Sequence, residues 1–250
     1  MEFIIEKCKI VHISKGISNH VEKILNKYPM KLFTKFQNVK YYLCVIGVFN
    51  DFDVSIIKQA VKNRLNVFVI WVGTDCHILH NYKKIVKSPF IRHYSISPNI
   101  YEILEKNKLN PCPITFSIVE ESYFLSKKLN QKKRNCIYIF NGLKEYDRTL
   151  FFGKPIYDSV IHTLTEKHQF LLEQFIFSRE LSVKYNEMNT IYEKCFIGLR
   201  LCQVDGNSST VQEMKLMNIP IIHNCSNYGI KWKTEHDVVN TILKYYHELF

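Results

Sequence analysis

Continuous apolar runs alternate with helical patterns along this chain. In the first half these runs lack a polar residue at every second position, which is typical of strands buried on both faces of a parallel sheet. They occupy residues 9–14, 41–47, 66–72 and 91–96. Helical spacing of apolar residues lies between and after them, at 19–28, 54–64 and 98–106. Asp53 is expected to cap the second of these helices. The first half therefore predicts an α/β unit.

The pattern changes at residues 126–135 and then starts again. That stretch is polar and basic, which favours a linker, although a solvated loop inside one domain is the alternative. Strand patterns then cover 136–140, 195–201 and 219–223, helical patterns cover 154–164, 185–194 and 237–250, and 169–177 suits either. We predict two Rossmann-like domains, residues 1–132 and 133–250, facing each other across a cleft. The terminal helix, 237–250, would pack back toward the first domain.

The net charge of +11 is concentrated in the first half of the chain. Residues 1–132 hold 20 lysines and arginines against 10 acidic residues, whereas residues 133–250 hold 14 against 13. The simpler explanation of this uneven charge is a bias in composition. The alternative is that the first domain contacts an anionic membrane surface or a charged acceptor. No nucleic-acid-binding signature is present, so we expect no nucleic-acid partner. The absence of a membrane-spanning run predicts a cytoplasmic protein with at most peripheral membrane contact.

The 8 cysteines do not form a recognisable metal-binding or disulfide pattern in the sequence. None belongs to a Cys-x-x-Cys pair, and several lie inside apolar runs. We therefore expect reduced, mostly buried cysteines that pack as small hydrophobic residues, and no metal site.

Two carboxylates eight positions apart, Asp205 and Glu213, bracket a turn of small polar residues. The turn lies between the apolar runs at 195–201 and 219–223, so it joins a strand to a helix in a βαβ unit. The small residues let a ligand approach the backbone N–H groups at the helix start. They are Gly206, Asn207, Ser208, Ser209 and Thr210. The alternative is that Asp205 only caps the helix and Glu213 is a solvated helical residue.

A sugar nucleotide has the chemistry that this arrangement would recognise. Helix N–H groups suit its diphosphate, and Glu213 could accept hydrogen bonds from both ribose hydroxyls. Asp205 would meet sugar hydroxyls, and Arg200 at the end of the preceding strand would neutralise phosphate charge. Asn141 and Gly142, which follow another predicted strand, are further donor-binding candidates. Less specific candidates for stabilising the diphosphate are Lys144, Arg148 and Lys154.

The residues from 191 to 222 resemble the donor-binding region of retaining GT-B glycosyltransferases, especially the family 4-like group. The resemblance rests on 195–201, on Asp205 to Glu213 and on the following Pro220. That family typically has Glu-x7-Glu, and here Asp205 replaces the first glutamate. The resemblance implies a GT-B fold, donor binding in the second domain, acceptor binding in the first, and no essential metal or cofactor.

The expected activity is transfer of a sugar, most simply from a UDP-sugar, to a hydroxyl of a glycan, lipid or protein, with retention. Asp205 and Arg200 are the expected catalytic residues. If the enzyme inverts, it needs a general base in the first domain, for which Asp75 and His77 are candidates. A sugar-nucleotide-binding protein without turnover is another alternative. A dinucleotide-binding enzyme is disfavoured, because only Gly16 follows the first strand where a glycine-rich loop is required.

Overall fold

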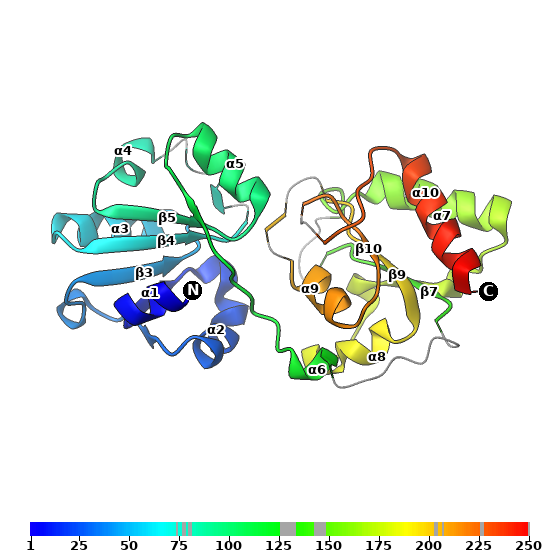
Figure 1. Ribbon diagram of the computed structural model, residues 1–250, viewed down its shortest axis with the longest axis horizontal. Helices are drawn as coiled ribbons and strands as arrows, with labels where there is room; N and C mark the ends of the chain where they lie inside the picture. Colours follow the sequence, from blue (N-terminus) through cyan, green and yellow to red (C-terminus); the bar gives the residue numbers. More distant parts are fainter. Residues whose placement is uncertain are drawn as a thin grey trace. The chain divides into compact units, whose positions relative to one another are not determined.

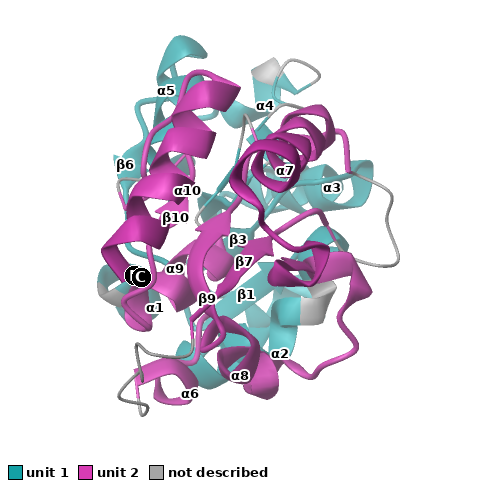
Figure 2. Cartoon of the chain, turned by 90° about the vertical axis from the view of Figure 1, so that its right-hand side faces the viewer, with its two compact units in different colours: residues 1–118, 204–207 teal, residues 119–203, 208–250 magenta. Residues whose placement is uncertain are grey.

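The computed structural model describes residues 1–73, 75–76, 79, 82–125, 134–142, 149–202, 205–206, 208–225 and 228–249. The chain forms two compact units (Figure 2). The first contains residues 1–118 and 204–207, and the second contains residues 119–203 and 208–250. The units therefore divide at 118/119. The linker predicted around 126–135 lies largely outside the described residues.

The first unit is built on a six-stranded sheet in which every pair of neighbours is parallel (Figure 1). Its strands are β1 (Ile10–Ile13), β2 (Lys31–Leu32), β3 (Tyr42–Ile46), β4 (Asn66–Trp71), β5 (Ile91–Ser95) and β6 (Cys112–Pro113), in the order β2-β1-β3-β4-β5-β6. The four strands predicted from apolar runs are confirmed. The chain passes outward from β1 to β2 and then returns to β3 on the other side of β1. That reversal marks a topological switch point, where open α/β sheets bind ligands.

Helices cover both faces of this sheet, which explains why its central strands, β3 and β4, are mainly apolar and buried. Leu43 and Val45 of β3 pack toward α3 (Asp51–Lys62) and α5 (Pro98–Lys106). Cys44 and Ile46 face the opposite way, in one cluster with residues of α1 (Glu2–Lys7) and α2 (Val21–Lys27). A short helix, α4 (Lys83–Val86), precedes β5. The core of the unit is therefore two apolar layers with the sheet between them.

The second unit repeats the plan with four parallel strands in the order β10-β9-β7-β8. They are β7 (Cys136–Ile139), β8 (Phe175–Phe177), β9 (Cys195–Leu199) and β10 (Ile221–Ile222). Apolar residues of α7 (Lys154–His168) and α10 (Glu235–Leu249) cover one face. Those of α6 (Ser122–Leu125), α8 (Met188–Tyr192) and α9 (Ser209–Leu216) cover the other. The predicted α/β class is thus confirmed for both halves.

Some predicted boundaries differ from the structure. The ambiguous segment 169–177 contains a 3-10 turn followed by β8, and the helix predicted at 185–194 is a 3-10 turn followed by α8. The terminal helix, α10, packs on α7 and β9 of its own unit. Its approach to the first unit stays a prediction. The described 3-10 turns are Lys15–His20, Phe36–Asn38, Leu172–Gln174, Ser178–Glu180 and Tyr185–Glu187.

Two helices of the first unit, α3 and α5, begin at a side-chain cap, and the cap of α3 corrects the sequence analysis. Asn50, and not Asp53, caps α3, since its side chain accepts a hydrogen bond from the Asp53 N–H at 3.0 Å. Asp53 completes a capping box from the third helical position. Ser97 caps α5, whose first residue is a proline. Among the described residues, none of the helices combines the length and apolarity needed to cross a bilayer.

Candidate functional site

The first turn of α9 begins at the carboxyl edge of the second sheet, after β9. Ser208 is the N-cap residue, but its side chain makes no capping hydrogen bond. Its hydroxyl is buried and has no hydrogen-bond partner in the described part of the chain. Ser209 and Thr210 form the first turn. Because the first N–H groups of a helix lack internal partners and carry partial positive charge, this end of α9 can receive an anionic oxygen.

Glu213 lies one turn into α9 among tyrosines. Its side chain is only 3% exposed, and its Oε2 accepts a hydrogen bond from the Tyr192 hydroxyl at 2.7 Å. Burial and the negative charge of Glu213 raise the pKa of Tyr138 and Tyr185. The hydroxyls of Tyr138 and Tyr185 therefore stay protonated. A carboxylate has two acceptor oxygens, and Oε2 is the one that meets the Tyr192 hydroxyl.

Arg200, directly after β9, has its side chain packed against two aromatic rings that contact each other. Its guanidinium carbon lies 3.9 Å from the ring centroid of Phe140 and 5.2 Å from that of Phe152. Its N–H donates to the Ile222 carbonyl at 3.0 Å, so its backbone continues the pairing toward β10. The two rings meet edge to face at 84°, so the planar cation can stack on one of them at most, and the shorter distance is to Phe140. Arg200 thus supplies a fixed positive charge at the carboxyl edge of this sheet.

Asn141 and Gly142, which follow β7, are tied to the loop after β8. The Asn141 N–H donates to the Ser178 hydroxyl at 3.1 Å, and the Asn141 Oδ1 accepts from the Arg179 N–H at 3.1 Å. The Ser178 hydroxyl in turn donates to the Gly142 carbonyl at 2.7 Å. Gly142 has a φ of 107°, which few other residues adopt. Since parallel strands end at one edge, the structure brings this turn to the same edge as Arg200.

The remaining predicted donor-site residues show no arrangement specific to a ligand, or lie outside the described residues. Asp205 and Gly206 group with the first unit, and the Asp205 Oδ1 accepts from the Gly206 N–H at 2.9 Å. Lys154 is exposed and forms an ion pair with Asp158 at 2.6 Å, so a surface role suits it better. Asn207, Lys144, Arg148 and the candidate base His77 lie outside the described residues.

Asp75 is completely buried, and its hydrogen bonds connect two loops of the first unit. Its carboxylate accepts from the N–H groups of Val48 at 3.2 Å, Val72 at 3.1 Å and Gly73 at 2.7 Å. Burial raises the pKa of Asp75 to about 6, although these backbone hydrogen bonds act in the opposite direction. A general base must reach the acceptor hydroxyl. Within the described residues, these hydrogen bonds of Asp75 come from backbone N–H groups, which favours a role in holding these loops together. Its role as a base stays a prediction.

A histidine and an aspartate are paired in the interior of the first unit, at the switch point. The sequence analysis did not predict this pairing. His12 of β1 lies 2.8 Å from Asp53 of α3, between Nε2 and Oδ1. The Ser14 hydroxyl and the Phe49 N–H donate to the other carboxylate oxygen, at 2.5 and 2.9 Å. Burial opposes ionisation, but the bonds from His12, Ser14 and Phe49 outweigh it and lower the pKa of Asp53. The pairing could have been predicted, because both residues lie near the carboxyl ends of neighbouring strands.

The expectation of no metal treated the chain as lacking an Asp-x-Asp motif, and that was wrong, because residues 51–53 are Asp-Phe-Asp. The carboxylates of such a triplet are of the kind that holds divalent cations. Here Asp53 is engaged by His12 and Ser14, and Asp51 accepts from the Tyr82 hydroxyl. Within the described residues, the grouping of side chains suited to a metal ion is a different one, Cys202 with His223 and Cys225. These three residues have no metal-binding spacing in the sequence.

Comparison with known proteins gives matches only at the level of structure. No family model matches the sequence, and no curated protein matches it. A solved glycosyltransferase from Rickettsia africae ESF-5 aligns with a TM-score of 0.67 at 10% identity, covering 97% of this chain and 89% of that one. A sucrose-phosphate synthase from Thermosynechococcus elongatus aligns with a TM-score of 0.58 at 9% identity, covering 91% and 67%.

The chain has the GT-B fold. Both alignments extend over nearly all of it, so the similarity includes both α/β units and not one Rossmann-like unit alone. The predicted fold class is therefore confirmed. Identities of 9% and 10% establish the architecture. In a GT-B chain, the function has to be argued from the residues at the sheet edges.

Proposed function

We propose that this chain is a glycosyltransferase that takes a sugar from a nucleoside-diphosphate sugar and transfers it to a hydroxyl acceptor. One observation carries the proposal. The N-terminus of α9 has a buried Ser208 hydroxyl without a described partner, and the buried carboxylate of Glu213 lies one turn further on. A sugar nucleotide presents a diphosphate and a ribose diol, which are the matching groups.

Each group has a role in this proposal. The first-turn N–H groups of α9 and the Ser208 hydroxyl bind the diphosphate, and Glu213 accepts from the ribose hydroxyls. Arg200 stabilises the charge that develops when the diphosphate leaves, because its cation is already oriented by Phe140 and Phe152. Asp205 binds hydroxyl groups of the transferred sugar. Asn141 and Gly142, which follow β7, also line the donor site.

Two stereochemical outcomes follow from different observations. The resemblance to family 4-like enzymes favours retention, a metal-independent reaction and a UDP-sugar donor. The pairing of His12 with Asp53 favours the alternative of inversion. A carboxylate that accepts from a histidine stabilises the cation formed when the imidazole removes a proton, so His12 would be the acceptor's base. The configuration of the product's new glycosidic bond separates these two mechanisms.

The donor prediction is tested by measuring thermal stability of the full chain with UDP, GDP, TDP and their sugars. A ligand that binds only the folded state raises the unfolding temperature as its concentration rises. We expect one nucleotide series to do so, with release of the nucleoside diphosphate when an acceptor is present. A folded chain that binds none of them and releases nothing contradicts the proposal. Binding without transfer to any glycan, lipid or protein acceptor would support a non-catalytic binding protein.

A further inference from the structure

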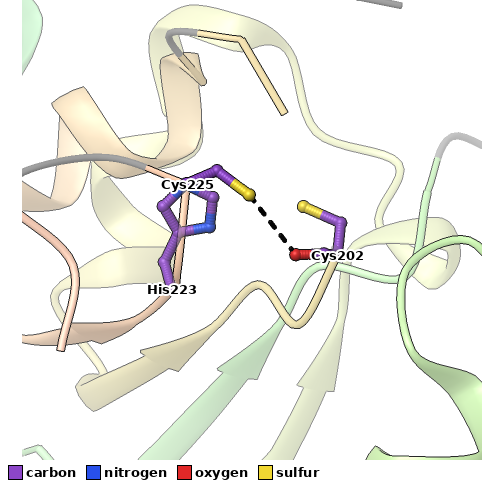
Figure 3. Close-up of side chains that lie close together, drawn as sticks. All are labelled: Cys202, His223 and Cys225. Carbon is purple, nitrogen blue, oxygen red and sulfur yellow. Dashed lines mark hydrogen bonds between the residues drawn. The ribbon is translucent and has the colours of Figure 1, made fainter. Parts of the chain in front are cut away.

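Three side chains of metal-ligand type meet in the interior of the second unit (Figure 3). Cys202 follows β9, while His223 and Cys225 follow β10. Their ligand atoms all lie within 4.8 Å of one another, and the side chains are 0%, 0% and 2% exposed. The Cys225 thiol donates to the Cys202 carbonyl at 3.5 Å, so the two loops are in direct contact.

The hydrogen bond between His223 Nδ1 and a carbonyl group determines which ring nitrogen can coordinate a metal ion. Its Nδ1 lies 3.1 Å from the carbonyl oxygen of Arg200. A carbonyl oxygen can only accept, so Nδ1 carries the proton and Nε2 presents its lone pair. Histidine ligands of metal ions are generally held in this way, with the second ring N–H donated to a carbonyl or carboxylate. The tautomer of His223 is therefore set for coordination through Nε2.

The loop that carries His223 and Cys225 is held in place independently of any ion. The His223 N–H donates to the Ile230 carbonyl at 3.0 Å, and the Asn224 side chain makes two bonds to the Trp232 backbone, at 2.9 and 3.0 Å. Gly229 packs so closely that a Cβ there would come within 2.2 Å of the His223 carbonyl oxygen. These contacts prearrange the ligands on the loop.

We propose that Cys202, His223 and Cys225 bind a zinc ion. Two thiolates and an imidazole are ligands that Zn²⁺ prefers, and sites with three protein ligands take a water molecule as the fourth. Binding displaces the two thiol protons. The resulting unit of Zn²⁺ and two thiolates has no net charge, which suits a buried position better than an isolated ion would. This proposal replaces the expectation of no metal.

The zinc ion would position Arg200. It ties the loop after β9 to the loop after β10, and His223 passes this constraint to the Arg200 carbonyl through its Nδ1–H. The ion itself takes no part in sugar transfer. Its presence is accordingly a separate question from the proposed function, and it can be measured without any substrate.

Metal content of the untagged full chain tests the proposal. After dialysis against Zn²⁺ and then buffer, elemental analysis should find about one zinc per chain. Replacement of zinc by Co²⁺ should give the intense charge-transfer absorption of a thiolate-bound cobalt. The wild-type chain alone supplies both readouts, so they do not depend on a variant that folds.

Variants then locate the ion. His223→Phe should lose the bound zinc, whereas His223→Cys should keep it, because a third thiolate is also a zinc ligand. Cys195→Ser is the matched control, since Cys195 is equally buried in the same unit but outside the cluster. The proposal is overturned by a folded wild-type chain that holds no stoichiometric zinc and gives no thiolate–cobalt band. Peptide mapping that finds Cys202 and Cys225 joined by a disulfide in the folded wild-type chain would also overturn it.

Discussion

Asp75 shows how burial and hydrogen bonding compete at a single residue. Burial raises its pKa from 3.8 to about 6. Between these pH values the folded chain binds a proton at this site that the unfolded chain has already lost. The free energy of unfolding therefore falls as the pH rises through this range. A difference of about two pKa units corresponds to about 3 kcal/mol at this one residue.

Asp75→Asn should remove this pH dependence. We expect the stability of the variant, relative to the wild type, to increase from about pH 4 to about pH 7, because the wild type alone loses its buried proton. Urea unfolding at several pH values measures this difference. Asp237→Asn is the control of opposite sign, since backbone bonds from Lys233 and Thr234 lower the pKa of Asp237. Parallel curves for the wild type and Asp75→Asn would contradict the assignment.

Glu213→Gln tests the carboxylate proposed to bind ribose. Loss of its charge should weaken nucleotide binding by about 2 kcal/mol, or roughly 30-fold, because hydrogen bonds to an ionised group are the stronger ones. Tyr192→Phe is the matched control, since it removes the hydroxyl that bonds to Glu213 and leaves the carboxylate in place. It should lower stability with little change in affinity. Titration calorimetry distinguishes these outcomes, and equal affinities for wild type and Glu213→Gln would count against the ribose role.

At the scale of elements, the cap of α3 is tied to the His12–Asp53 pair. Asn50→Ala should lower the free energy of unfolding by about 1 kcal/mol, as loss of an N-cap generally does. Ser55→Ala is the control within the same helix, because the Ser55 hydroxyl is exposed and bonds only to the preceding turn, at Phe52. Chemical denaturation compares the two. A cost at Ser55 that equals the cost at Asn50 would mean that capping is not the cause.

The elements also show what a sequence pattern can predict. β3 and β4 were predictable because burial on both faces makes a strand apolar throughout. β2 and β6 were missed, since each has two residues and too little pattern to detect. The start of α9 was predictable from its small residues. The grouping of Cys202 with His223 was not, because their loops meet only when β9 and β10 pair in parallel.

At the scale of the whole molecule, the two sheets carry different chemistry in the same architecture. The first has its buried histidine and aspartate at the switch point between β1 and β3. The second has its helix N-terminus, stacked arginine and buried glutamate after β9. Acceptor chemistry in the first unit and donor binding in the second, which the resemblance implies, stay predictions.

Hydrogen exchange of the full chain, with and without the sugar nucleotide that stabilises it most, tests the central claim most directly. Amide groups that bind a ligand, or lie beneath it, exchange more slowly. The account predicts protection at the start of α9 and after β7 and β9, around residues 208–213, 139–142 and 199–202. Clear stabilisation with protection confined to the first unit, and none at the start of α9, would contradict it.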